Sequence, residues 1–89
     1  MKSALIEYRT SVYVAAGWRG VIVNARATLS KTGRMATIDE VTAIDGETPA
    51  RYMSRTGSRR QAYNGLSIAQ REQGARKRVS TLISCEVDE

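Results

Sequence analysis

Eight cationic side chains gather between positions 49 and 84, and their type and spacing are the strongest chemical signal in this chain. They are Arg51, Arg55, Arg59, Arg60, Arg71, Arg76, Lys77 and Arg78. We call residues 49–84 the basic segment; Glu72 is its only acid, so its net charge is +7. Such a local positive field attracts anionic partners and binds phosphates through counterion release, although a solvated surface has the same composition.

Arginine outnumbers lysine eleven to three in the whole chain. Guanidinium groups form bidentate contacts with phosphate or carboxylate and stack on bases, whereas lysine suffices for solubility. The ratio therefore favours a binding surface. A GC-rich coding sequence is the alternative explanation, because it favours arginine codons without selection for binding.

Residues 54–60 combine three hydroxyl side chains, a glycine and the guanidinium groups of Arg55, Arg59 and Arg60. Backbone N–H groups, hydroxyls and arginine forks in one loop can converge on a phosphate. The Gly-Lys-Ser/Thr ending of a P-loop is absent, so nucleotide hydrolysis is not implied. We expect this loop to contact a nucleic-acid backbone or an acidic protein surface, with a purely solvated loop as the alternative.

A second cationic cluster, at positions 76–78, ends the best helix candidate, residues 66–78. Ser67 is the expected cap, and cations at the carboxyl end of a helix compensate its dipole. A seven-residue spacing would place Arg71 and Arg78 on one helix face. The cluster thus predicts either a cationic stripe that continues the binding surface or simple dipole compensation.

Three aromatic residues are candidates for contact with a partner. Tyr63 and Tyr52 lie within the basic segment, where they can stack on unpaired bases. Trp18 is expected near a hairpin tip, where it can enter a groove or a protein pocket. A place in the core is the alternative for each of them, because the chain has few other large side chains.

Catalysis is weakly indicated, because the chain contains no histidine and only one cysteine, Cys85. Its carboxylates follow no known metal-loop spacing, and Asp39, Glu40, Asp45 and Glu47 lie beside expected turns. We therefore expect no enzyme activity, no cofactor and no metal site, and we place Cys85 in the core.

At 89 residues the chain is expected to form a single domain, residues 1–89. One cysteine rules out an intrachain disulfide, and no apolar run reaches the length of a membrane span. These features predict a protein of the reducing cytoplasm that does not engage a membrane.

Strict alternation of apolar and polar residues predicts strands over residues 4–14 and 21–29, joined as an antiparallel hairpin. For residues 35–44 two interpretations stay open. A strand continues the meander toward the Asp45-Gly46 turn, whereas Thr37 and Glu40 would form the capping box of a short helix. Residues 79–87 alternate again as a terminal strand, unless the preceding helix continues into them.

These elements predict an α+β fold: an antiparallel meander of three or four strands, one helix packed on its apolar face, and a C-terminal strand. The favoured function is a small non-enzymatic binding protein that engages nucleic acid mainly through phosphates. The alternative is a small phage-type inhibitor or regulator that binds a host nucleic-acid enzyme through protein contacts. A homo-oligomer, with an acidic region at 39–47 facing the basic segment of another copy, is a third option.

Overall fold

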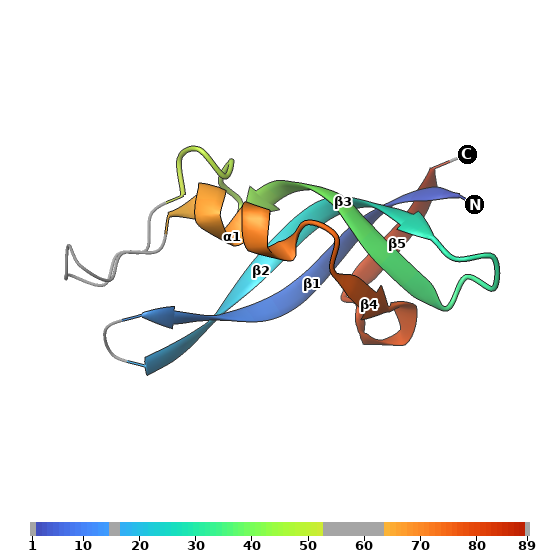
Figure 1. The fold of residues 1–89 in the computed structure, drawn as a ribbon, viewed down its shortest axis with the longest axis horizontal. Coiled ribbons are helices and arrows are strands. Elements are labelled where there is room, and N and C mark those ends of the chain that lie inside the picture. Colours follow the sequence, from blue (N-terminus) through green and yellow to red (C-terminus); the bar gives the residue numbers. More distant parts are fainter. Residues whose placement is uncertain (1, 15–16, 53–63, 89) are drawn as a thin grey trace.

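The computed structural model describes residues 2–14, 17–52 and 64–88, and the side chains of positions 13, 14 and 88 are outside this description. It shows an α+β fold dominated by one curled antiparallel sheet of five strands in the order β4-β3-β2-β1-β5 (Figure 1). The strands are β1 (Ser3–Val14), β2 (Gly17–Leu29), β3 (Met35–Ile44), β4 (Arg76–Arg78) and β5 (Ser84–Asp88). A short helix, α1 (Gly65–Glu72), and a 3-10 turn, η1 (Val79–Thr81), complete the described elements.

The hairpin of β1 and β2 confirms the expectation from alternation, although β2 begins at Gly17, four residues before the expected start. The two strands pair from Ser3 opposite Thr28 to Val14 opposite Gly17. Every second side chain faces the core, so Ile6, Tyr8 and Val23 are almost completely buried. A pleat of period two places these residues on the inner face of the sheet.

The strand interpretation of residues 35–44 is confirmed, with two irregularities. The register of β3 against β2 skips first Asp39 and then Thr42, which are the extra residues of two β-bulges. Both bulges are tied to β2. The hydroxyl of Thr28 donates to Oδ2 of Asp39 at 2.7 Å, and Thr42 Oγ1 donates to the carbonyl of Asn24 at 3.1 Å.

The bulges explain why a helix competed with a strand in the sequence. The buried residues of β3 are Ala36, Ile38, Val41 and Ile44. Each bulge lengthens the interval between inward residues from two to three, and a spacing of three is also the spacing of a helix face. The spacing of three between Ile38, Val41 and Ile44, which resembled a helix face, therefore comes from a bulged strand.

The chain leaves β3 through the expected Asp45-Gly46 turn. Asp45 has φ 49° and Gly46 has φ 81°, as a type I′ turn requires, and Ile44 and Glu47 exchange both backbone hydrogen bonds. Ile44 and Glu47 thus form an isolated bridge, and residue 51 lies in the following turn.

Helix α1 is shorter than the sequence predicted, and its cap is a different residue. It begins at Gly65, with Asn64 as N-cap: Asn64 Oδ1 accepts from the N–H of Ser67 at 2.8 Å. It ends at Glu72, and Gly74 then turns the chain with φ 83°, a conformation that favours glycine. The expectation of a helix over 66–78 was wrong because the chain after Gly74 pairs with β3 instead.

Residues 76–78 form β4, an edge strand whose register places Met35 opposite Arg78 and Thr37 opposite Arg76. The stripe that would have joined Arg71 to Arg78 on one helix therefore does not exist. The terminal strand is confirmed only for its second half. Residues 79–81 form η1, and β5 then pairs with β1 from Glu7 opposite Ser84 to Ser3 opposite Asp88.

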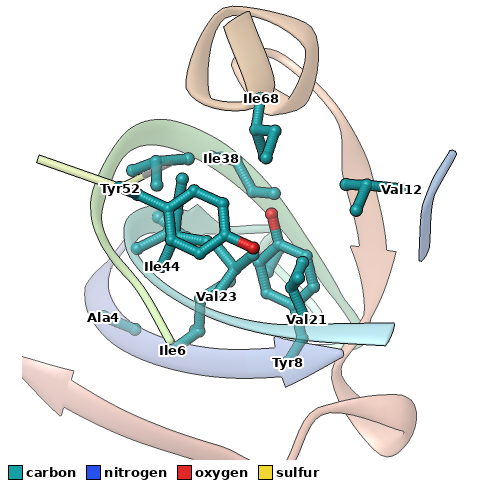
Figure 2. Packing of buried hydrophobic residues seen from close by; sticks show 14 of the residues in the cluster. Ala4, Ile6, Tyr8, Val12, Val21, Val23, Ile38, Ile44, Tyr52 and Ile68 are labelled. Atoms are coloured by element: carbon teal, nitrogen blue, oxygen red, sulfur yellow. The ribbon is translucent and has the colours of Figure 1, made fainter. Parts of the chain in front are cut away.

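The core lies between the inner face of the sheet and α1. Figure 2 shows Ile68 of α1 reaching toward Ile38 and the side chains of β1 and β2. Tyr52, directly before the segment that the structure leaves undescribed, is 3% exposed and completes this cluster. Cys85 is half-buried and packs against the same core, as expected.

Candidate functional site

The one acid of the basic segment, Glu72, is buried and holds two of the segment's cations. Its carboxylate lies 3.3 Å from Nε of Arg71 and 3.4 Å from Nζ of Lys77. It also accepts a hydrogen bond of 3.0 Å from the hydroxyl of Tyr8 on β1. The last residue of α1 is thereby fastened to the sheet, and two predicted site residues serve this attachment.

Lys77 and Arg71 have further contacts that fix their positions. The ammonium of Lys77 lies over the ring of Tyr8, 4.9 Å from its centroid. Arg71 Nη2 donates to the carbonyl of Ser11 at 3.2 Å. Burial and the adjacent carboxylate of Glu72 raise the pKa of Tyr8 well above its ordinary value. The side chains of Tyr8, Arg71, Glu72 and Lys77 therefore stabilise the fold by contacting one another. Of the two cations, Arg71 has the larger exposed part that a partner could contact.

Arg76 and Arg78 differ from Lys77, although they are adjacent in sequence. Alternation along β4 turns Lys77 toward the core and leaves Arg76 and Arg78 exposed. Among the residues that the structure describes, neither arginine has an acid within salt-bridge distance. Charged residues on an edge strand also prevent pairing with another sheet, which is the structural explanation for them.

Arg51 is exposed in the turn after Glu47, and the neighbouring Tyr52 is not available for stacking. Burial raises the pKa of Tyr52, with a further contribution from the carboxylate of Asp45 and a smaller opposing one from Arg19. Its hydroxyl has no hydrogen-bond partner in the described part of the chain. The core alternative is therefore correct for Tyr52.

Four predicted site residues, Arg55, Arg59, Arg60 and Tyr63, lie outside the described residues. The expectation for the loop at 54–60 stays a prediction for the same reason.

Trp18 lies near the start of β2 and is 72% exposed, so it belongs to the surface and not to the core. It is far from β4. Arg76 is opposite Thr37, which is opposite Thr28, and Trp18 lies ten residues from Thr28 along β2. Ten residues of strand span roughly 30 Å. The structure therefore separates Trp18 from the exposed arginines of β4.

Two cations outside the basic segment flank Trp18 and were not selected from the sequence. Arg19 is exposed beside it on β2, and Arg9 is exposed on β1. A Cβ atom at Gly20 would lie 3.7 Å from Cδ of Arg9, so the Arg9 side chain lies across this glycine. Alternation places Arg9 on the outer face, and the hairpin register would have brought it next to the segment of Trp18.

The described residues contain no group of three or more side chains able to hold a metal ion. None of the described helices is both long and apolar enough to cross a membrane. Comparison with known proteins finds no matching protein family, no similar curated protein and no similar solved structure. The site is therefore argued from its own residues alone.

Proposed function

We propose that this chain is a non-enzymatic binding protein that holds nucleic acid mainly through the phosphates of its backbone. One observation carries the proposal. The only acid of the basic segment is turned inward, where it is occupied by Arg71 and Lys77, while Arg51, Arg76 and Arg78 stay exposed. The positive charge at the surface is thus not cancelled by the segment's own acid, and guanidinium groups are suited to phosphate.

The proposal makes a quantitative prediction about salt. If about five phosphates are neutralised, the logarithm of the association constant should fall with the logarithm of salt concentration at a slope of about −4 to −5. Fluorescence anisotropy with labelled DNA and RNA, titrated over a range of salt concentrations, measures this slope. The mass of the protein in solution should be determined alongside, because a homo-oligomer would multiply the number of contacts.

The variant Arg76→Gln/Arg78→Gln tests the described part of the surface. Both side chains are exposed, so the fold should be retained, and the loss of two phosphate contacts should reduce the slope by about 2. Lys2→Gln/Arg26→Gln removes the same charge from exposed positions outside the segment and is the matched control. Equal slopes for wild type and the β4 variant, or no binding by wild type at physiological salt, would contradict the proposal.

The exposure of Trp18 favours a second candidate, the inhibitor or regulator that binds a nucleic-acid enzyme. Large, rigid aromatic side chains are common anchors of protein interfaces. Under this alternative the wild-type protein binds no nucleic-acid probe, and Trp18→Ala abolishes capture of a protein partner without changing the unfolding transition.

A further inference from the structure

We propose that the end of the β1–β2 hairpin is a ribbon arm that enters the major groove of a DNA duplex. We define the arm as residues 9–14 of β1 with residues 17–22 of β2, which are register partners from Arg9 opposite Ile22 to Val14 opposite Gly17. The inference rests on the proposed function and makes it more specific, because it names double-stranded DNA as the partner and gives the docking element.

The arm is the only part of the described sheet with two strands. On one side, β5 stops pairing with β1 at Glu7, whose carbonyl accepts from the N–H of Ile83 at 2.7 Å. On the other side, β3 stops pairing with β2 at Val23, and the turn residue Asp45 then closes the edge at Ile22 through two hydrogen bonds of 2.7 and 2.8 Å. Beyond these points the ribbon leaves the body of the sheet, as the blue end of the hairpin in Figure 1 shows.

The direction of the arm is set at its base. A two-stranded hairpin is marginally stable in water by itself. Here Val12 and Val21 are almost fully buried in the core, and Arg71 at the end of α1 donates to the carbonyl of Ser11. The inner face of the arm is thus held against the core as far as Val12, while Arg9, Trp18 and Arg19 remain exposed. Preorganisation of this kind lowers the entropic cost of binding.

The chemistry of the arm selects an anionic partner. No aspartate or glutamate occurs between positions 9 and 22, and the two charged residues there are Arg9 and Arg19. They lie on opposite faces of the ribbon, because Arg9 shares a face with Ile22 and Arg19 shares the other face with the buried Val12. A duplex groove has a phosphate backbone on each wall. Arginines on opposite faces of the ribbon can therefore contact one wall each.

The dimensions of the arm also fit the major groove of DNA. Six residues of strand extend about 20 Å, and paired strands are about 5 Å apart before side chains are added. The major groove of B-form DNA is about 12 Å wide and about 8.5 Å deep, and it admits a two-stranded ribbon. Trp18, near the tip, would then be carried toward the base edges or the sugar-phosphate wall.

The test compares a labelled 20-base-pair DNA duplex with one of its single strands. We expect Arg9→Gln/Arg19→Gln to weaken duplex binding about tenfold or more, while affinity for the single strand changes less than about twofold. Arg76→Gln/Arg78→Gln should lower the affinity for the duplex and for the single strand by similar factors. Thermal unfolding of each variant shows whether the fold is retained. Lysine in place of glutamine at position 19 keeps the charge, so Arg9→Gln/Arg19→Lys should recover part of the duplex affinity that Arg9→Gln/Arg19→Gln loses.

The single tryptophan supplies an independent readout. Saturating duplex should reduce acrylamide quenching of Trp18 fluorescence, and methyl green, a ligand of the major groove, should compete with the protein for the duplex. Competition by the minor-groove ligand netropsin alone would overturn the inference.

The remaining outcomes separate the two proposals. If the arm variant binds the duplex as well as wild type while the β4 variant does not, phosphate binding stands and the arm inference is wrong. If wild type binds neither probe, both are wrong, and loss of a captured protein partner in the arm variant would then identify a protein interface instead.

Discussion

At the scale of single residues, the buried carboxylate of Glu72 holds together side chains from the sheet and the helix. One carboxylate accepts from the hydroxyl of Tyr8 and faces the cations of Arg71 and Lys77, and all its partners come from different elements or from the end of its own helix. A buried carboxylate is stable only when it is paired and hydrogen-bonded. The cluster therefore connects β1, α1 and β4 through one side chain.

The hydroxyl of Tyr8 gives this cluster a measurable pH dependence. At neutral pH, Tyr8→Phe should lower the free energy of unfolding by about 1 kcal/mol, because it removes a buried hydrogen bond to a charged acceptor. Folded Tyr8 keeps its proton above pH 10, whereas tyrosine in the unfolded chain ionises with a pKa of about 10. The wild type should therefore lose stability as the pH rises above about 10, by up to about 1.4 kcal/mol per pH unit from this group.

Urea unfolding at pH 7, 10 and 11 measures this difference, and the gap between wild type and Tyr8→Phe should narrow at alkaline pH. Tyr52→Phe is the matched control. Its hydroxyl is buried without a partner in the described part of the chain, so its removal should leave stability at pH 7 unchanged or higher. A constant gap across the three pH values would show that burial and the contact with Glu72 do not raise the pKa of Tyr8 as described.

At the scale of elements, α1 depends on a close approach at its first residue. A Cβ atom at Gly65 would lie 2.8 Å from Cβ of Tyr52 and would overlap the carbonyl oxygen of Pro49. The N–H of Gly65 also donates to the carbonyl of Tyr52 at 2.9 Å. The helix begins against this turn, and only glycine leaves enough space there.

Gly65→Ala should therefore destabilise the protein by about 1–3 kcal/mol, although alanine has the higher helix propensity. Thermal or urea unfolding measures the effect. Leu66→Ala, at the next position of the same helical turn, is the control: Leu66 is 61% exposed, so a change within about 0.5 kcal/mol is expected. Equal stability of Gly65→Ala and wild type would mean that α1 does not pack on this turn.

The elements also show how far the sequence could be interpreted. Alternation was sufficient for β1 and for residues 21–29 of β2, because both are regular with one buried face, but it missed residues 17–20, where β2 begins. It was ambiguous for β3, where the bulges at Asp39 and Thr42 change the interval between inward residues. It failed after Gly74, because the pairing of Arg76 with Thr37 is a long-range contact that no local pattern contains.

For the candidate site, too, the sequence could not show what depends on long-range contacts. Composition identified the basic segment, but it could not show that Arg71 and Lys77 are directed to Glu72 while Arg76 and Arg78 are exposed. That division depends on which face of β4 each residue occupies. Arg9 was missed because it lies far from the segment in sequence and comes next to Gly20 only through strand pairing.

At the scale of the whole molecule, the sheet has a supported body and a ribbon that projects from it. Local opening is easiest where neighbouring strands are few. Amides in residues 9–14 and 17–20 should exchange at least about tenfold faster than those in 23–29, which have a strand on each side. Hydrogen exchange followed by mass spectrometry measures this, and equal protection would show that another part of the protein covers the ribbon.

The register of the first and last strands has a practical consequence. Ser3 and Asp88 are direct partners, and both ends of the chain lie at the end of the molecule opposite the ribbon (Figure 1). Partner Cα atoms in antiparallel strands are about 5 Å apart. A short linker can therefore join the two ends, and a circular permutant opened at the turn after Leu29 would keep every strand pair while moving both new ends to an exposed loop.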